Sequence, residues 1–315
     1  MKLFKPKFWD LKRISFFALL LMPISYLINF VVFIKNKTTK KLRFNIPIIC
    51  IGNIYLGGTG KTPLAIKIFN MLKKIGKKPV IIKKFYRNQY DEALLIKDQV
   101  ENIEFLASRV ESIKSALSKS YNVAILDDGL QAYSIRKDLS IVCFNGDQLI
   151  GNGLTIPSGP LRENLNALKN CQIVIINGEK NLPFEDKIKK ISSKVDIYYS
   201  KYIPENLENF KKENLFAFAG IGTPNNFFKL LKDNGLNVLK QKSFPDHHIY
   251  SQKEVESLLD YSIKNDLKLL TTEKDFYRIK KLGFTNIEYL SITVKIFEEE
   301  KLLKQMKFFI NNENI

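Results

Sequence analysis

The stretch LGGTGKTP, residues 56–63, decides the fold class of this chain. It follows a short apolar run, Ile48–Gly52, that is typical of a strand, and it opens a helical pattern that continues to Lys74. A phosphate-binding loop needs glycines, because backbone N–H groups must point at a phosphate from the start of a helix. It also needs a Lys for the β- and γ-phosphates and a Ser or Thr for Mg²⁺. The residues that supply these groups are Gly57, Gly58, Thr59, Gly60, Lys61 and Thr62.

One position departs from the usual GxxxxGK[ST] pattern, since Tyr55 stands where the first glycine is expected. A plain glycine-rich turn between a strand and a helix is the alternative. The Gly-Lys-Thr triplet in a strand–loop–helix context favours the phosphate-binding loop (P-loop). We expect the Lys61 side chain to be exposed in the empty loop.

A second motif, NVAILDDGLQ at residues 122–131, supplies the acidic half of such a site. Its run of apolar residues is followed by Asp127 and Asp128. An acid at the end of a neighbouring strand holds the metal in this class of site. An ordinary strand followed by a turn is the alternative, which the upstream loop weakens. The sequence therefore predicts a nucleoside triphosphate site with Mg²⁺ bound by Thr62 and Asp127, and with Asp128 nearby.

Short apolar runs alternate with helical patterns along the rest of the chain, which predicts mainly parallel sheets covered by helices. The predicted class is α/β, with a P-loop NTPase-like core and a second, smaller α/β unit. Gly151–Pro160 is the expected hinge, and Ile103–Ser118 is expected to be helical. The expected divisions are an N-terminal membrane anchor (1–35), a P-loop core (36–150), a second unit closing over the site (151–295), and a C-terminal helix and tail (296–315).

The N-terminal run Ile14–Ile34 contains no charged residue. As a helix it would be about 32 Å long, close to the ~30 Å of a bilayer core. Its length disfavours a signal peptide, and a buried core helix is the alternative. Pro23 and Asn29 weaken a spanning assignment. Because basic residues flank both ends, a segment that dips into one leaflet or lies on an anionic surface stays open.

The composition bears on the partners. Lys and Arg total 50 against 32 Asp and Glu, a formal net charge of +18, and such an excess suggests an anionic partner. A general compositional bias is the alternative. The basic residues form no compact block, so we expect no nucleic-acid partner. The cysteines Cys50, Cys143 and Cys171 have no paired spacing, which predicts free thiols rather than a disulfide or zinc site.

A kinase would need a base for an acceptor hydroxyl. The acidic stretch QYDEALLI contributes Asp91 and Glu92, and the loop FPDHHIYS contributes the only histidines, His247 and His248. The loop position raises the functional interpretation of this histidine pair to equal standing with a structural one. A P-loop protein could also be a GTPase or a partitioning-type ATPase, but no guanine-reading Asn-Lys-x-Asp is evident and Leu56 replaces the extra lysine of that ATPase class.

Motifs in order along nearly the whole chain resemble the tetraacyldisaccharide 4′-kinase family, the lipid A kinases of Gram-negative bacteria. They are GNIYLGGTGKTP, YDEALLI, LDDGLQ, GNGLTIPSGPLRE, FAFAGIGTPNNFF, FPDHHIYS and LLTTEKD. The departure at Tyr55 is itself a feature of that family. The chain departs from the family at residues 83–86, which read KKFY where the family usually has Ser-Arg-Gly-Tyr, at Ala93 in place of proline, and at Ala132 in place of a frequent histidine.

The resemblance implies transfer of the γ-phosphate of ATP to the 4′-hydroxyl of a tetraacylated disaccharide 1-phosphate in lipid A biosynthesis. It implies ATP and Mg²⁺ as cofactors, a location on the cytoplasmic face of the bacterial inner membrane, and no obligate protein partner. An anchored enzyme would meet such an acylated substrate in the membrane. Arg162 and Arg109 are the arginines that we expect near substrate phosphate, because an Arg can hold phosphate oxygens through two donors.

The expected catalytic set is Lys61, Asp128, Asp91 as the base and His247 as its orienting partner, in a site between the two units. The block TTEKD, residues 271–275, is expected to be a helix start capped by Thr272. A membrane-bound P-loop ATPase that acts on a partner protein is the alternative function. The two functions differ in the fate of the γ-phosphate, which reaches a lipid in the first and water in the second.

Overall fold

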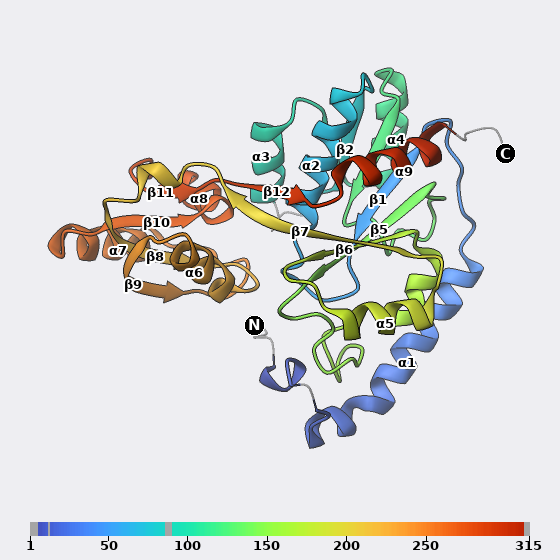
Figure 1. Cartoon of the computed structure of the whole chain (residues 1–315), viewed down its shortest axis with the longest axis horizontal. Helices are drawn as coiled ribbons and strands as arrows, with labels where there is room; N and C mark the ends of the chain where they lie inside the picture. Colours follow the sequence, from blue (N-terminus) through green and yellow to red (C-terminus); the bar gives the residue numbers. More distant parts are fainter. Residues whose placement is uncertain (1–5, 12, 86–89, 312–315) are drawn as a thin grey trace. The chain divides into compact units, whose positions relative to one another are not determined.

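The structure, a computed structural model, describes residues 6–11, 13–85 and 90–311, without the side chains of residues 90–92. The chain divides into two compact units (Figure 1). Unit 1 comprises Met1–Phe85, Val100–Lys201 and Val294–Ile315, and unit 2 comprises Tyr86–Gln99 and Tyr202–Thr293.

An eight-stranded sheet forms the centre of unit 1, in the order β12-β7-β6-β5-β1-β4-β2-β3. From β3 to β7 all neighbours pair in parallel. The central strands β1, β4 and β5 are buried along their whole length, as in parallel sheets covered on both faces. The bounds are β1 Ile48–Gly52, β2 Pro79–Lys84, β3 Ile103–Leu106, β4 Val123–Asp127, β5 Leu139–Asn145, β6 Ile173–Asn177, β7 Asp196–Pro204 and β12 Ile292–Ile296.

Helices with apolar faces pack against this sheet. In α2, Leu64, Ile68 and Leu72 are buried at helical spacing. Ile113 of α4 lies in one core cluster with β2, and Phe184 of α5 lies edge-on to Phe144 of β5, with ring centroids 5.1 Å apart. The bounds are α1 Phe16–Thr38, α2 Lys61–Lys74, α4 Arg109–Ser118, α5 Leu182–Ile191 and α9 Glu299–Asn311, with short 3₁₀ helices at Lys7–Trp9 and Leu165–Asn170.

Unit 2 is built on a smaller, four-stranded parallel sheet in the order β11-β10-β8-β9. Its strands are β8 Asn214–Ala219, β9 Asn237–Ser243, β10 Lys268–Thr272 and β11 Glu288–Leu290, and its helices are α3 Tyr90–Gln99, α6 Pro224–Asp233, α7 Gln252–Lys264 and α8 Glu273–Lys280; the short 3₁₀ helix Leu207–Asn209 also belongs to it. The predicted cap is confirmed, since the side chain of Thr272 accepts a hydrogen bond from the backbone N–H of Asp275. Both sheets are therefore of the predicted parallel kind.

The compact units differ from the divisions expected from the sequence. Because β6 and β7 extend the same sheet as β1, the segment from residue 151 to Lys201 belongs to unit 1. The expected hinge at Gly151–Pro160 is therefore wrong, because this segment is a loop inside unit 1. The expected helix over residues 103–118 is also wrong in its first part, where β3 pairs with β2 before α4 begins.

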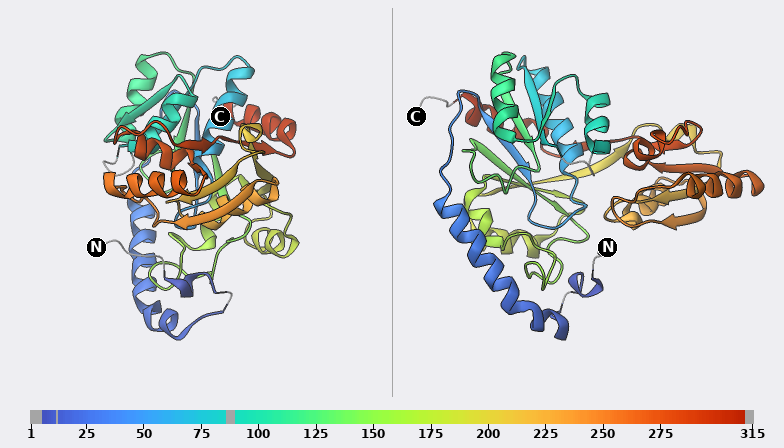
Figure 2. Two further views of the ribbon diagram at one scale, coloured as in Figure 1. Left: turned by 90° about the vertical axis from the view of Figure 1, so that its left-hand side faces the viewer. Right: turned by 180° about the vertical axis from the view of Figure 1, so that it is seen from behind.

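The N-terminal helix α1 lies along unit 1 with most of its length uncovered (Figures 1 and 2). It has the length and hydropathy of a membrane-crossing helix, and only 11% of its most apolar window is buried. A core helix would be mostly buried, so this interpretation of the N-terminal run is excluded. Pro23 lies inside the helix without ending it. The uncovered side includes Phe16, Phe17, Leu20, Leu27, Phe30 and Phe33.

The cysteines are free, as predicted, and all of them are buried. Burial raises the pKa of Cys50 to about 11 and the pKa of Cys143 to about 12. A thiol reacts as its thiolate, so these side chains act as packing groups rather than as nucleophiles.

Candidate active site

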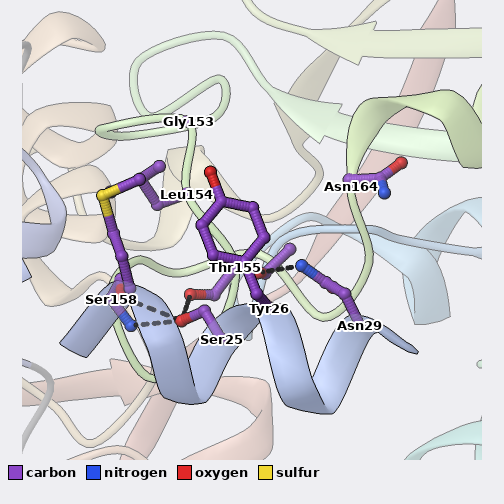
Figure 3. A pocket seen from close by; sticks show the side chains of 9 residues that line it. Ser25, Tyr26, Asn29, Gly153, Leu154, Thr155, Ser158 and Asn164 are labelled. Carbon is purple, nitrogen blue, oxygen red and sulfur yellow. Dashed lines mark hydrogen bonds between the residues drawn. The ribbon is translucent and has the colours of Figure 1, made fainter. Parts of the chain in front are cut away.

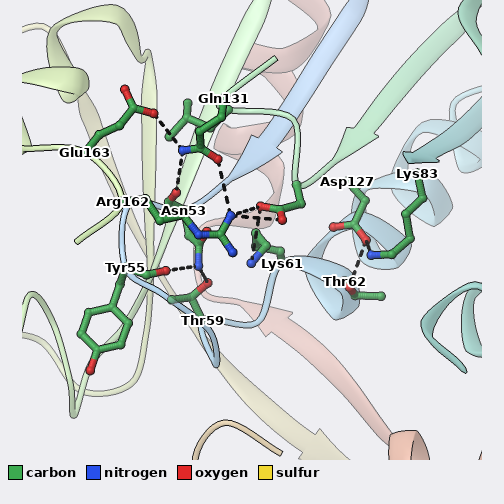
Figure 4. Close-up of polar contacts among 12 residues, drawn as sticks. Asn53, Tyr55, Thr59, Lys61, Thr62, Lys83, Asp127, Gln131, Arg162 and Glu163 are labelled. Atoms are coloured by element: carbon green, nitrogen blue, oxygen red, sulfur yellow. Dashed lines mark hydrogen bonds and ion pairs between the residues drawn. The ribbon is translucent and has the colours of Figure 1, made fainter. Parts of the chain in front are cut away.

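The loop between β1 and α2 has the backbone of a phosphate cradle (Figure 4). Gly57, Gly58 and Gly60 have φ angles of 80°, 56° and 82°, a left-handed conformation that glycine adopts without steric cost. Gly60 is the N-cap of α2, so the unpaired N–H groups of the first turn face the loop. Asn53 Nδ2 donates to Thr59 Oγ1 at 2.9 Å and ties the loop to the end of β1.

The hydroxyl and the carboxylate predicted to hold a metal lie together. Thr62 Oγ1 donates to Asp127 Oδ2 at 3.0 Å, because β4 pairs with β1 and ends beside the loop. Both residues are buried, and Asp127 Oδ1 has no hydrogen-bond partner among the described residues. Mg²⁺ prefers one or two protein oxygens together with phosphate oxygens and waters. The pair fits that ion, although no group of three or more His, Cys, Asp or Glu is found in the described part of the chain.

Asp128 collects the cations of the site. Its φ of 57° is unusual for a residue with a side chain, and this turn directs the carboxylate towards the loop. Lys61 Nζ lies 3.7 Å from Asp128 Oδ1, and Arg162 Nη1 lies 2.9 Å from Oδ1 and 3.1 Å from Oδ2. Arg109 Nη2 donates to the backbone carbonyl of Asp128 at 2.7 Å. The structure thus brings together four predicted site residues, Lys61, Arg109, Asp128 and Arg162, from separate parts of the chain.

The environment of Lys61 differs from the expectation of an exposed side chain. Only 14% of its side chain is exposed, because it lies against Asp128. Burial lowers the pKa of Lys61, the neighbouring Asp128 opposes this shift, and the cations Arg162 and Lys83 add to it. Burial alone would raise the pKa of Asp128, but Lys61 and Arg162 more than offset it, so the pKa falls below its usual value. The carboxylate is therefore ionised at neutral pH.

Three further side chains belong to this site that the sequence did not assign to it. Lys83 Nζ lies 2.6 Å from Asp127 Oδ2. Gln131 Oε1 accepts from Arg162 Nη1 at 3.4 Å, and Gln131 Nε2 donates to Glu163 Oε1 at 2.8 Å. Gln131 and Glu163 lie in the motifs LDDGLQ and GPLRE, and Lys83 opens the departing stretch KKFY. Their positions inside those segments were the only sequence signal in the described part of the chain that could have assigned them to the site.

The proposed base and its partner are both residues of unit 2. Asp91 lies in the first turn of α3, and its side chain is outside the described residues. His247 has a φ of 54°, and its Nδ1 lies 3.3 Å from Arg278 Nη2. His248, by contrast, stacks on Phe244 with ring centroids 4.7 Å apart, and its Nε2 lies 3.1 Å from Glu254. The two histidines therefore differ, and His248 is the structural one.

A buried carboxylate holds the arginine beside His247. Asp275 is fully buried and accepts hydrogen bonds from Gly220 N at 2.9 Å, Tyr250 Oη at 3.1 Å, Thr272 Oγ1 at 2.7 Å and Arg278 Nη1 at 2.9 Å. Buried charge is tolerated when it is paired and hydrogen-bonded in this way. The TTEKD block is thus a helix cap that also fixes Arg278.

A cavity of about 250 Å³ lies between α1 and the loop of residues 153–158 (Figure 3). Ser25 Oγ donates to the Thr155 carbonyl oxygen at 2.9 Å and lies 2.8 Å from Ser158 Oγ. Asn29 Nδ2 donates to Thr155 Oγ1 at 2.8 Å. Asn29, which weakens a spanning assignment, is thus one of two residues that attach α1 to this loop, and Ser25 is the other.

Comparisons with known proteins agree on one family. The family model described as Tetraacyldisaccharide-1-P 4′-kinase matches residues 17–311. The chain is 43% identical over 309 residues to the tetraacyldisaccharide 4′-kinase of Pelagibacter ubique, covering 97% of this chain and 98% of the relative. It is 34% identical to the enzyme of the same name from Rickettsia bellii, covering 88% and 90%. A solved structure described as the "apo" form of LpxK from Aquifex aeolicus in complex with ATP matches with a TM-score of 0.75 and 25% identity, covering 93% of this chain and 99% of that one.

Proposed function

The chain belongs to the tetraacyldisaccharide-1-P 4′-kinase family, and we propose on this basis that it transfers the γ-phosphate of ATP to the 4′-hydroxyl of a tetraacyldisaccharide 1-phosphate. The observation that carries the proposal is the convergence of Lys61, Arg162 and Arg109 on Asp128 beside the P-loop. Such a site offers a phosphate cradle and positive charge beside it, and phosphoryl transfer depends mainly on positioning and charge stabilisation of this kind.

Lys61 and the backbone N–H groups of the loop would hold the β- and γ-phosphates. Thr62 and Asp127 would hold Mg²⁺, which supplies neutralisation of phosphate charge when it is bound. The arrangement of their oxygen atoms and the unpartnered Oδ1 of Asp127 support this role within the described part of the chain. An arriving phosphate would compete with Asp128 for Lys61 and so release the lysine from its 3.7 Å contact.

Arg162 is the proposed contact for a phosphate group of the acceptor, with Arg109 in support. Nη1 of Arg162 makes the recorded contacts to Asp128, and a guanidinium carries further N–H donors that can reach a phosphate. Arg109 contacts the backbone of Asp128, so it holds the carbonyl of the residue to which Lys61 and Arg162 are paired.

Asp91 is the proposed base for the acceptor hydroxyl, and His247 is its proposed partner. A positioned base helps because a sugar hydroxyl is a poor nucleophile at neutral pH, and such assistance is typically worth roughly 10²–10⁴-fold. Support comes from the different surroundings of the two histidines, since 33% of the His247 side chain is exposed while His248 is packed among aromatic rings.

We propose a location at the bacterial inner membrane, with the catalytic part on the cytoplasmic face, and the membrane association in this proposal is supported by helix α1. Its uncovered apolar side can enter the lipid, whereas Ser25 and Asn29 bind unit 1. An enzyme held in this way would meet an acylated acceptor without extracting it from the bilayer. We therefore propose attachment through one side of the helix.

The experiment that tests the function uses γ-labelled ATP and a tetraacyldisaccharide 1-phosphate in mixed micelles with the full-length protein. We expect label in the lipid fraction. Label that appears only as free phosphate, with or without the lipid, would contradict the kinase and indicate an ATPase instead. A lipid acceptor without a free 4′-hydroxyl is the matched control and should remain unlabelled.

A further inference from the structure

Lys83 is a cation placed on the carboxylate that is proposed to bind Mg²⁺. It lies on β2, and the parallel pairing of β2 with β4 puts it in register with Asp127. Residues in register on neighbouring strands project from the same face of the sheet. The pairing therefore fixes Lys83 beside Asp127 through the backbone, before any side-chain contact is considered.

The contact between these two residues is buried and close. Lys83 Nζ lies 2.6 Å from Asp127 Oδ2, and the side chains are 5% and 0% exposed. The same oxygen accepts from Thr62 Oγ1 at 3.0 Å (Figure 4). The ammonium thus contacts the carboxylate oxygen that also receives the hydroxyl of the proposed metal pair. Breaking one half of a buried ion pair is strongly unfavourable, because it leaves the other charge without a partner.

Each of the two carboxylates at the site faces at least one protein cation. Lys61 and Arg162 face Asp128, and Lys83 faces Asp127. The Lys83 charge also lowers the pKa of Lys61, after burial and Arg162. Asp127 is therefore neutralised by a protein cation in a site that is already rich in positive charge, and a divalent ion arriving at that carboxylate would be repelled by Lys83.

We propose that Lys83 weakens the dependence of ATP binding on Mg²⁺, because its ammonium acts as a resident counter-ion of Asp127. This inference rests on the proposed function, in which ATP occupies the P-loop. Without Lys83, Asp127 would be a free anion close to the phosphates, and ATP would bind poorly until Mg²⁺ screened it. With Lys83, part of this screening is supplied by the protein, so Mg²⁺ adds less to the affinity.

The quantity to measure is the ratio of the ATP affinity in Mg²⁺ to that in EDTA, determined by equilibrium binding on the full-length protein in detergent. Linkage makes this ratio a direct report of the coupling between metal and nucleotide. We expect the ratio to be about tenfold larger in Lys83→Met than in the wild type, within the usual range of such couplings. Lys84→Met is the matched control, because it removes the same charge from the next residue of β2, which projects to the other face.

A purely structural ion pair gives a different result. In that case Lys83→Met lowers the stability but leaves the ratio of ATP affinities equal to that of the wild type. This result would overturn the inference, whereas ATP binding by the variant would still support the nucleotide site. A change of equal size in Lys84→Met would overturn it as well, because the effect would then be one of general charge. Loss of ATP binding in the wild type under both conditions would overturn the proposed function and this inference together.

A second variant covers the case in which Lys83→Met does not fold. Lys83→Gln removes the charge but keeps an N–H donor for Asp127, so the buried carboxylate stays hydrogen-bonded. The same enlarged ratio is expected. If neither neutral variant folds, the ratio measured on the wild-type protein tests the inference. An increase in ATP affinity of more than roughly 100-fold on adding Mg²⁺ would overturn it, because a site with a resident counter-ion should gain less.

Discussion

One guanidinium nitrogen of Arg162 contacts both carboxylate oxygens of Asp128, at 2.9 Å and 3.1 Å. Arg162 directly follows Leu161, whose strand-like bridge to Tyr55 joins it to the segment before the P-loop. The pair therefore links the GPLRE motif to the acidic motif, with Lys61 on the same carboxylate. A change at any one of these three residues should alter how the other two are held.

Arg162→Lys should raise the KM for the lipid acceptor about tenfold or more and leave the ATP affinity within a few-fold. Lysine keeps the charge but loses the planar fork that can hold a phosphate and Asp128 together. Steady-state kinetics with each substrate varied in turn measure the effect. Arg136→Lys, at an exposed position of the same unit, is the control. A weaker ATP affinity with an unchanged acceptor KM would assign Arg162 to the nucleotide instead.

Lys61→Ala should lower turnover by about 10²–10³-fold or more, because it removes a charge that acts on the transferring phosphate. It should also lower the stability slightly, since Asp128 loses a partner but keeps Arg162. Lys67→Ala in the same helix, which loses an ion pair to Glu299, is the control for stability. Near-normal turnover in folded Lys61→Ala would remove the P-loop interpretation.

Asp91→Ala and His247→Ala should each lower turnover more than they weaken ATP binding, and the double variant should lose less than the product of the two. Groups that act as a unit show this non-additivity. The measurement is a double-mutant cycle on turnover, with ATP affinity followed in parallel. His248→Ala tests the neighbouring ring and should act mainly on stability, because it packs on Phe244. If the loss of turnover in the double variant equals the product of the two single losses, His247 and Asp91 act independently and the proposed partnership is contradicted.

Deleting residues 1–35 should release the protein from membranes and also lower its melting temperature. The deletion removes apolar surface, but it also removes Asp10, which accepts from Tyr55 Oη at 2.7 Å, and Trp9, which donates to Pro157 O at 3.0 Å. The double variant Leu20→Asn, Leu27→Asn changes only uncovered residues and should weaken flotation with vesicles while leaving the melting temperature nearly unchanged. Retention of either protein after a high-salt wash would place the attachment elsewhere.

Glu273→Gln should raise the melting temperature at neutral pH, and the gain should shrink as the pH falls through the raised pKa of Glu273 towards 4.5 and be lost below it. Burial raises the pKa of Glu273 above its ordinary value of 4.5, even though Gln99 donates to it at 2.8 Å. A raised carboxyl pKa means that stability is greatest below the unfolded value and is lost as the pH rises through the folded one. Thermal melts across pH test this, with exposed Glu288→Gln as the control. A gain in melting temperature of equal size at all pH values would contradict the raised pKa of Glu273.

The motifs whose residues lie close together in the sequence could be predicted from it. The P-loop, the Asp127 and Asp128 pair, and the Thr272 cap all depend on residues within a few positions of one another, and each is found where the pattern predicts it. The unit boundaries were not readable, because strand pairing between distant segments decides them: β7 and β12 lie side by side in the sheet. Lys83 was missed for the same reason, since its partner is fixed by the register of β2 on β4.

The four crossings between the units also impose an order on synthesis. The chain leaves unit 1 after Phe85 and again after Lys201, and it returns finally at Val294. The edge strand β12 and helix α9, whose Glu299 pairs with Lys67, thus leave the ribosome after unit 2. Since chains fold domain by domain as they emerge, unit 2 is complete while unit 1 still has an open edge. The open edge of the kinase core is consequently closed only after unit 2 has been synthesised.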